Sequence, residues 1–326
     1  MSIKKYGKKT ALTFYREMNK IRSFELKAAE LFMQGLMAGN IHTYAGQEAA
    51  AVGACQALKQ SDFITSTHRG HGHCLAKGGK ANIMMAELFG KSTGNCKGLG
   101  GSMHVAIYPK TGSLYATAIV GSGIPIAAGV GFGLKHKKSQ SIVATFFGDG
   151  AVNTGAFHEG MNLIALWKLP VLLYCENNQY AMSTPVSKAV SSRSIAERAR
   201  AYNMETVVVN GNDVLSVYVA TKDAAKRART SSQPTFFECI TYKMKGHGVY
   251  DKGEYRPREE VEKWLAKDPI KTFEKRLIDE KVLTENTIQE IKQSVQKEIE
   301  DAVKFATEGT ALPFDEILNY VYAGDD

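Results

Sequence analysis

Two polar motifs stand after apolar runs in the middle of the chain. Gly148-Asp149-Gly150 follows the run at 142–147 (IVATFF), and Asn177-Asn178 follows the run at 171–175 (VLLYC). An Asp carboxylate and an Asn carbonyl are hard oxygen donors that suit Mg²⁺ or Ca²⁺, and Mg²⁺ commonly completes its shell with phosphate oxygens. Glycines beside the carboxylate let the backbone approach a phosphate. The motifs therefore predict a magnesium–diphosphate site, provided that the fold brings them together.

The segments around the motifs predict that they meet. Short and almost wholly apolar runs are typical of strands buried on both faces of a parallel sheet. The segment between the runs, 154–168, has helical content and stops before Pro170, which makes a strand–helix–strand unit. Such a unit has a right-handed crossover and parallel strands, so both motifs lie at the carboxyl edge of the sheet, where ligands bind. We expect Asp149 and Asn178 to lie close together there.

The same alternation continues toward the C-terminus. Residues 206–209 and 235–241 read as strands, and residues 213–229 between them read as a helix. The chain is therefore predicted to have an α/β fold, with a mostly parallel sheet and helices on both faces.

The two ends of the chain have helical patterns. Residues 10–39 and 48–58 predict helices, the first with Thr10 as its N-cap, whereas 66–79 starts as a loop. Residues 287–309 predict a surface helix with one buried stripe and a capping box at its start, formed by Thr287 and Glu290. We expect three parts: an N-terminal helical segment at 1–60 that packs on the core, a diphosphate-binding α/β domain at 61–256, and a C-terminal helical extension at 257–326.

Composition excludes several classes of protein. The net charge of +8 favours an anionic partner, but the basic residues are scattered and lack interleaved aromatics, which does not favour nucleic acid. Five widely spaced cysteines indicate neither a disulfide framework nor a zinc ribbon. The N-terminus has no apolar stretch of the signal-peptide kind, and no apolar run is long enough to span a membrane. We expect a cytoplasmic protein with no membrane partner.

Each polar motif by itself would be read as an ordinary turn, because Gly-Asp-Gly and Asn-Asn are common turn formers. Their placement at two neighbouring strand ends changes this, because the pattern resembles the signature of thiamine-diphosphate enzymes. The resemblance extends over nearly the whole chain to the alpha subunits of the two-chain 2-oxo acid and acetoin dehydrogenases, and the acetoin branch is closest at 66–74. The strings that carry it are HTYAGQEA (42–49), STHRGHGHCLAKG (66–78), GKSTGNCKGLGGSMH (90–104), AIVGSGIPIAAG (118–129), the stretch 148–185 and TYKMKGHG (241–248).

The resemblance implies a thiamine-diphosphate-binding fold and a role for each matching residue. Metal ligands would be Asp149, Asn178 and the carbonyl of Tyr180, holding Mg²⁺. Contacts to thiamine diphosphate would come from Arg69, Val120, Gly148, Gly150, Ala151 and Asn178, with Val120 between the two rings of the cofactor. Catalytic roles would fall to His247 and His68.

Three other histidines leave alternatives open. His71 and His73 belong to an H-x-x-H-x-H cluster with His68, but no carboxylate stands at a known zinc-ligand spacing, so a phosphate loop or an active-site wall is preferred. His104 either orders the glycine-rich loop or acts in the site.

The resemblance also implies partners. Thiamine-diphosphate enzymes take a Glu from a second α/β domain, for which this chain has no room, so we expect a beta-type subunit in a heterotetramer of two alpha and two beta chains. The implied activity is an oxidoreductase that cleaves acetoin or decarboxylates pyruvate or a branched-chain 2-oxo acid and passes the acyl group to a lipoyl acyltransferase. Half of a split transketolase-like enzyme and a non-catalytic phosphate- or nucleotide-binding module are the alternatives. Pocket residues that the second subunit supplies in part would decide which of these substrates is used.

Overall fold

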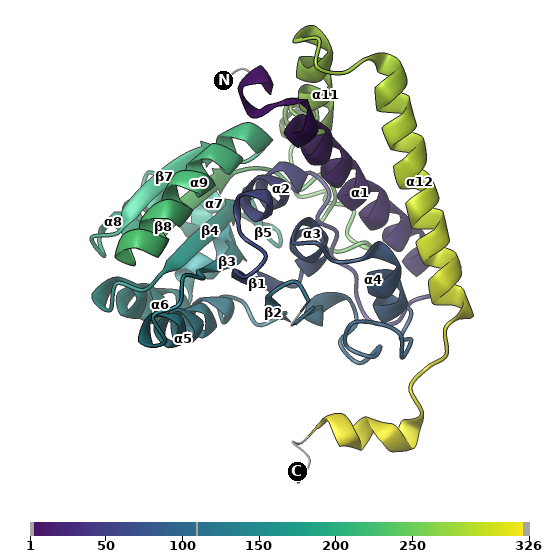
Figure 1. The fold of residues 1–326 in the computed structure, drawn as a ribbon, viewed down its shortest axis with the longest axis horizontal. Helices are drawn as coiled ribbons and strands as arrows, with labels where there is room; N and C mark the ends of the chain where they lie inside the picture. The colour runs from purple at the N-terminus through teal and green to yellow at the C-terminus, as the bar shows by residue number, and fades with distance from the viewer. Residues whose placement is uncertain (1–2, 109, 322–326) are drawn as a thin grey trace.

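A six-stranded parallel sheet forms the centre of the molecule in the computed structural model, which describes residues 3–108 and 110–321. The strand order is β2-β1-β3-β4-β8-β7, and every pairing in this sheet is parallel. Helices cover both of its faces (Figure 1). The strands are β1 (Phe63–Thr67), β2 (Ser113–Thr117), β3 (Val143–Gly148), β4 (Val171–Asn177), β7 (Glu205–Asn210) and β8 (Thr235–Ile240). The predicted α/β class and parallel sheet are confirmed.

The other elements surround this sheet. A small hairpin, β5 (Tyr180–Ala181) with β6 (Thr184–Pro185), follows β4, and short 3₁₀ turns occur at Ile3–Tyr6, Ser102–His104, Asp149–Asn153 and Phe314–Tyr320. The helices are α1 (Lys8–Met33), α2 (Glu48–Ala57), α3 (Gly70–Ala76), α4 (Ala81–Leu88), α5 (Gly123–His136), α6 (Gly155–Leu166), α7 (Val186–Ala189), α8 (Ile195–Arg200), α9 (Val214–Ser231), α10 (Arg258–Leu265), α11 (Pro269–Asp279) and α12 (Glu285–Glu308). None of the helices in the described residues is long and apolar enough to cross a membrane.

The predicted strand–helix–strand unit is β3, α6 and β4. Its two strands pair in register, with Gly148 opposite Glu176, so the turns that follow them leave the sheet side by side. Phe146 and Phe147 are both buried but belong to different hydrophobic clusters, one on each face of the sheet. Because successive side chains of a strand point to opposite faces, a strand covered on both sides is apolar throughout. This explains why the sequence of β3 identifies its place in the fold.

Several helix ends differ from the sequence predictions. Helix α1 begins after Gly7, so Thr10 is not its N-cap, and it ends at Met33, shortly before Gly35 adopts a positive φ of 76°. The hydroxyl of Thr284 accepts the backbone N–H of Thr287, so α12 starts earlier than the capping box predicted at Thr287 and Glu290. Half of 66–79 is helical, as α3, whose glycines permit close packing.

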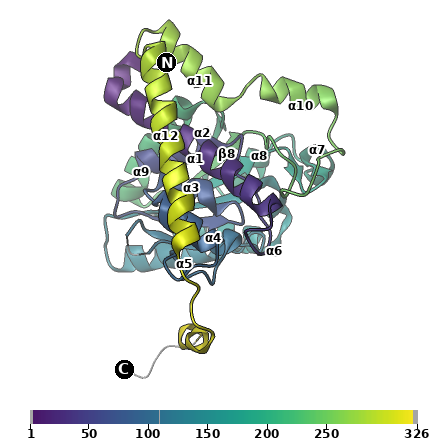
Figure 2. The same ribbon diagram turned by 90° about the vertical axis from the view of Figure 1, so that its right-hand side faces the viewer.

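The predicted C-terminal helical extension is confirmed and packs on the N-terminal helices. Helix α12 lies along α1 and α4, whereas the last described turn, Phe314–Tyr320, lies away from the body in both views (Figures 1 and 2). The stripe of α12 that faces the core includes Ile288, Val295 and Ile299, as predicted.

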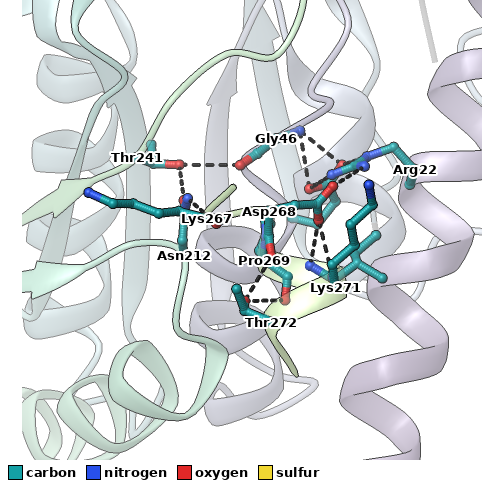
Figure 3. Close-up of polar contacts among 11 residues, drawn as sticks. Arg22, Gly46, Asn212, Thr241, Lys267, Asp268, Pro269, Lys271 and Thr272 are labelled. Atoms are coloured by element: carbon teal, nitrogen blue, oxygen red, sulfur yellow. Dashed lines mark hydrogen bonds and ion pairs between the residues drawn. The ribbon is translucent and has the colours of Figure 1, made fainter. Parts of the chain in front are cut away.

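A buried ionic network joins this extension to the body (Figure 3). Two nitrogens of Arg22 in α1 donate to the Glu48 carboxylate, at 2.6 and 2.9 Å, and a third donates to Asp268 at 3.0 Å. Asp268 caps α11 by accepting the N–H of Ile270. Glu48 accepts the N–H of Gly46, so the network fixes the turn that enters α2. The chain segments just before and just after that turn both extend to the candidate functional site.

Replacement of Arg22 tests this network. In Arg22→Met we expect the free energy of unfolding to fall by about 3–5 kcal/mol, because the buried carboxylates of Glu48 and Asp268 lose their cation. Urea denaturation of the isolated chain measures the change. Arg258→Met is the control, since the Arg258–Glu262 pair is exposed on α10 and should contribute no more than about 0.5 kcal/mol. Equal effects of the two substitutions would refute the assignment.

Candidate functional site

A cavity of about 310 Å³ opens at the carboxyl ends of β1, β3 and β4. This is the edge at which open α/β sheets bind ligands. All the residues that the sequence predicted for the site line this cavity: His68, Arg69, Val120, Gly148, Asp149, Gly150, Ala151, Asn178, Tyr180 and His247. They come from five separate segments of the chain, so it is the sheet topology that brings them together.

Three oxygen-bearing groups converge at the floor of the cavity. One end of the Asn178 side-chain amide lies 3.1 Å from both the Asp149 carboxylate and the Tyr180 carbonyl oxygen. When the amide oxygen occupies that end, the amide nitrogen at the other end donates to Gln47 Oε1 at 3.1 Å. Neighbouring ligands of an octahedral Mg²⁺, with bonds of about 2.1 Å, stand about 3 Å apart. The spacing and the donor set both fit this cation.

Two buried basic side chains, Lys243 and Arg69, lie beside this floor. Lys243 Nζ donates to the Tyr180 carbonyl at 2.6 Å. Burial, assisted by the positive charge of Arg69, lowers the pKa of Lys243 to about 7. Burial raises the pKa of Asp149, while Lys243 acts in the opposite direction. Lys243 was missed by the sequence analysis, although it follows the end of β8 just as Asp149 follows β3.

Arg69 is held rigidly in the cavity wall. Its guanidinium donates to the carbonyl oxygens of Thr43 at 2.8 Å and of His247 at 2.7 Å. Burial lowers the pKa of Arg69 to about 10, so its charge persists at neutral pH. A fixed cation beside Lys243 makes this part of the cavity suited to an anion such as a diphosphate.

Three histidine rings pack together beside Arg69, with the His42 ring in T-shaped contact with the other two. The ring centres of His42 lie 4.9 Å from those of both His68 and His247. Burial and the charge of Arg69 lower the pKa values of His42, His68 and His247 to about 3, about 2 and about 4. All three are therefore neutral at physiological pH and can both donate and accept. His42 was not among the predicted residues, because nothing in its local sequence indicates where it packs.

The other histidines lie outside the cavity. His71 is buried against Glu25 and Ser102, and His73 lies between Ser66 and Glu176. The preferred wall or phosphate-loop role is therefore wrong for both, since neither side chain lines the cavity and both pack in the core. No group of three or more His, Cys, Asp or Glu in the described part of the chain could hold a metal ion, which leaves no support for zinc there.

His104 lies in the glycine-rich loop. Its Nδ1 lies 3.3 Å from the Ala116 carbonyl, and the residue does not line the cavity, which agrees with the loop-ordering alternative. The loop itself is organised by Glu87, whose buried carboxylate accepts four backbone N–H groups, of Cys96, Gly98, Gly100 and Gly101.

Two glycine-dependent approaches shape the cavity. A Cβ on Gly150 would lie 2.8 Å from the Cβ of Ala181, so the β5–β6 hairpin can close over the turn after β3 only if residue 150 lacks a side chain. Gly121 has a φ of 84°, which favours glycine. Beside it, Ile119 and Val120 line the cavity and are 68% and 52% exposed. The cavity is thus closed on the sheet side and open along an apolar rim.

A parallel sheet with buried basic side chains and three converging oxygens at its carboxyl edge is an α/β arrangement suited to a metal–phosphate group. Comparison with known proteins then places it: the chain belongs to the dehydrogenase E1 component family, whose sequence model matches residues 16–314. Enzymes of this family depend on thiamine diphosphate.

Characterised relatives match over almost the full length. The alpha subunit of acetoin:2,6-dichlorophenolindophenol oxidoreductase from Bacillus subtilis is 48% identical over 96% of this chain and 93% of its own length. The corresponding protein from Cupriavidus necator is 39% identical, over 97% and 95%. The pyruvate dehydrogenase E1 component subunit alpha of Porphyra purpurea is 37% identical, over 96% and 92%. The chain is an alpha-type subunit of an oxidoreductase, and this naming implies a beta-type partner.

The neutral histidines predict acid sensitivity. Between about pH 4 and 6.5 the unfolded chain binds protons on His42, His68 and His247 that the folded chain does not, so the free energy of unfolding falls as the pH is lowered through this window. In His42→Gln we expect the slope to become shallower by up to about 1.4 kcal/mol per pH unit. Urea midpoints at pH 7 and pH 5 measure it. His136→Gln, at the exposed end of α5, should keep the wild-type slope, and an unchanged slope in His42→Gln would contradict the prediction.

Proposed function

We propose that this chain forms the metal–diphosphate half of the active site of a thiamine-diphosphate-dependent dehydrogenase that cleaves acetoin or decarboxylates a 2-oxo acid. The observation that carries the proposal is the convergence of Asp149, Asn178 and the Tyr180 carbonyl at 3.1 Å spacing in a cavity with two buried cations. Identity of 48% to an acetoin-oxidising subunit, against 37% to a pyruvate dehydrogenase subunit, makes acetoin the first substrate to test.

The residues present fit both proposed cofactors. Asp149, Asn178 and the Tyr180 carbonyl would hold Mg²⁺, and Gly148, Gly150 and Ala151 would border the diphosphate. Arg69 and Lys243 supply the positive charge that a diphosphate requires. When bound, thiamine diphosphate supplies a carbon nucleophile for attack on the substrate carbonyl.

The remaining side chains prepare the site for that chemistry. His68 and His247 are neutral, so each can hold or pass a proton at a ring nitrogen without first losing a charge. Val120 stands at the rim, where it would lie between the two rings of the cofactor. Hairpin β5–β6 and the buried floor exclude water from the metal side.

The proposal includes partners. Among the described residues that line the cavity, Asp149 is the only carboxylate, and it is committed to the metal. The Glu that contacts the cofactor's pyrimidine ring must then come from another chain, which we propose to be a beta-type subunit in a heterotetramer of two alpha and two beta chains. A lipoyl acyltransferase would accept the acyl group. Five free cysteines fit the cytoplasmic location that we propose.

Activity of the separated and combined subunits tests the function. We expect the isolated chain not to reduce 2,6-dichlorophenolindophenol with acetoin or pyruvate, and to do so with one of them after the beta subunit, Mg²⁺ and thiamine diphosphate are added. Turnover by the isolated chain would refute the divided site. No turnover of acetoin, pyruvate or branched-chain 2-oxo acids by the combined subunits would refute the proposed reaction.

Substitution of Asp149 tests the metal site separately. Asp149→Asn replaces a carboxylate oxygen with an amide and should weaken Mg²⁺-dependent binding of thiamine diphosphate by at least about 100-fold. Titration calorimetry on the combined subunits measures the affinity. Asp223→Asn, on the exposed side of α9, is the matched control and should bind like the wild type. If Asp149→Asn binds thiamine diphosphate with wild-type affinity, Asp149 is not a ligand of the metal.

A further inference from the structure

Two buried amides face each other beneath the proposed metal site. Gln47 is fully buried and Asn178 is 7% exposed. The side-chain nitrogen of Asn178 donates to Gln47 Oε1 at 3.1 Å. The other end of the Gln47 amide, Nε2, is buried and has no hydrogen-bond partner in the structure. A buried donor without a partner is costly, so this orientation needs a compensating gain.

The two amides have two mutually consistent arrangements. In one, Gln47 presents its oxygen, the Asn178 nitrogen points to it, and the Asn178 oxygen stands 3.1 Å from two other oxygens, of Asp149 and Tyr180. In the other, both amides are turned, so the Asn178 nitrogen donates to Asp149 and to Tyr180. The second arrangement satisfies the site without a cation, whereas the first places three oxygens together and requires one.

We propose that Gln47 is a positioning residue for the metal: its amide oxygen holds the Asn178 nitrogen and thereby turns the Asn178 oxygen toward the cation. This inference rests on the proposed function, because it concerns the same metal site. Binding of the cation offsets two unfavourable features of this arrangement. One is the buried Gln47 nitrogen that has no hydrogen-bond partner, and the other is the repulsion among the three oxygens that lie close together. The orientation of the two amides is thus coupled to cation binding: the first arrangement is favoured when the cation is bound and the second when it is not.

The backbone around Gln47 is fixed well enough to serve this role. Gln47 is the N-cap residue of α2, and its backbone N–H donates to the Tyr44 carbonyl at 3.1 Å. The preceding Gly46 has a φ of 103° and packs so closely against the Tyr242 carbonyl that no side chain fits. Gly46 is tied through its N–H to Glu48 and thus to Arg22, as Figure 3 shows. The terminal amide of the Gln47 side chain can rotate, but the backbone at Gln47 is held in place.

Metal affinity in two variants of Gln47 tests the inference. Gln47→Met keeps the size of the side chain and removes the acceptor, so the Asn178 nitrogen is free to turn toward Asp149. We expect the dissociation constant for Mn²⁺, used in place of Mg²⁺, to rise about 10–100-fold. Gln47→Glu retains an acceptor and should bind Mn²⁺ at least as tightly as the wild type. Electron paramagnetic resonance of free Mn²⁺ measures both, in the enzyme assembled with its beta subunit and thiamine diphosphate.

Activity at saturating Mn²⁺ provides an independent measurement. Gln47 touches no reacting atom, so kcat of Gln47→Met should return to within about twofold of wild type once the metal site is filled, while the Mn²⁺ concentration for half-maximal activity rises as the affinity falls. Gln56→Met is the matched control: it makes the same change on α2, where Gln56 bonds only the Ala76 carbonyl, and should leave Mn²⁺ binding unchanged.

The outcomes separate this inference from the function on which it rests. Wild-type Mn²⁺ affinity in Gln47→Met would overturn the positioning role. Equal weakening in Gln47→Met and Gln47→Glu would also overturn it, because it would show that Gln47 matters for packing rather than for its acceptor. Absence of Mn²⁺ binding by the wild-type assembly would instead overturn the metal site itself, and the inference with it. If Gln47→Met does not assemble, weak binding by Gln47→Glu alone would still refute the role.

Discussion

The parallel arrangement of β3 and β4 is the constraint on which the site depends. Because Gly148 pairs in register with Glu176, the residues that follow the two strands leave the sheet at one level, and Asp149 and Asn178 meet there. A one-residue shift of register would separate the two side chains and move the side chains of one strand to the opposite face of the sheet, away from the hydrophobic cluster that each of them packs in. The hydrophobic contacts that fix this register, on both faces of the sheet, are therefore also what fixes the spacing of the proposed metal ligands.

Burial determines how the groups around these ligands behave. It keeps the three histidines neutral and brings the pKa of Lys243 to about 7, while Arg69, which donates to two backbone carbonyls, keeps its charge at neutral pH. The cavity consequently has positive charge on the side where we propose that the diphosphate binds, and neutral proton donors and acceptors beside it. The Arg22 network contributes at longer range, since it fixes the turn from which Gln47 reaches Asn178.

The sequence predicted site residues that directly follow a strand better than site residues that come from irregular segments elsewhere in the chain. Asp149 and Asn178 were found because apolar runs identify buried strands and parallel strands share an edge. Lys243 follows β8 by the same rule and could have been found in this way. His42 and Gln47 could not, because they lie in an irregular segment whose path depends on the Arg22 network. Helix ends were predicted less well. Thr10 and Thr287 are residue types that suit an N-cap, but α1 and α12 begin at earlier residues.

The open side of the cavity connects assembly with catalysis. Ile119 and Val120 expose apolar surface at the rim, which is costly in water and favourable once another protein covers it. The described cavity residues include one carboxylate, Asp149, and in the role of metal ligand that we propose it would not be available for proton transfer to the cofactor. A beta subunit that covers the rim would supply the missing acid and exclude water in the same step. In the proposed enzyme the active site is thus complete only where the two subunits meet.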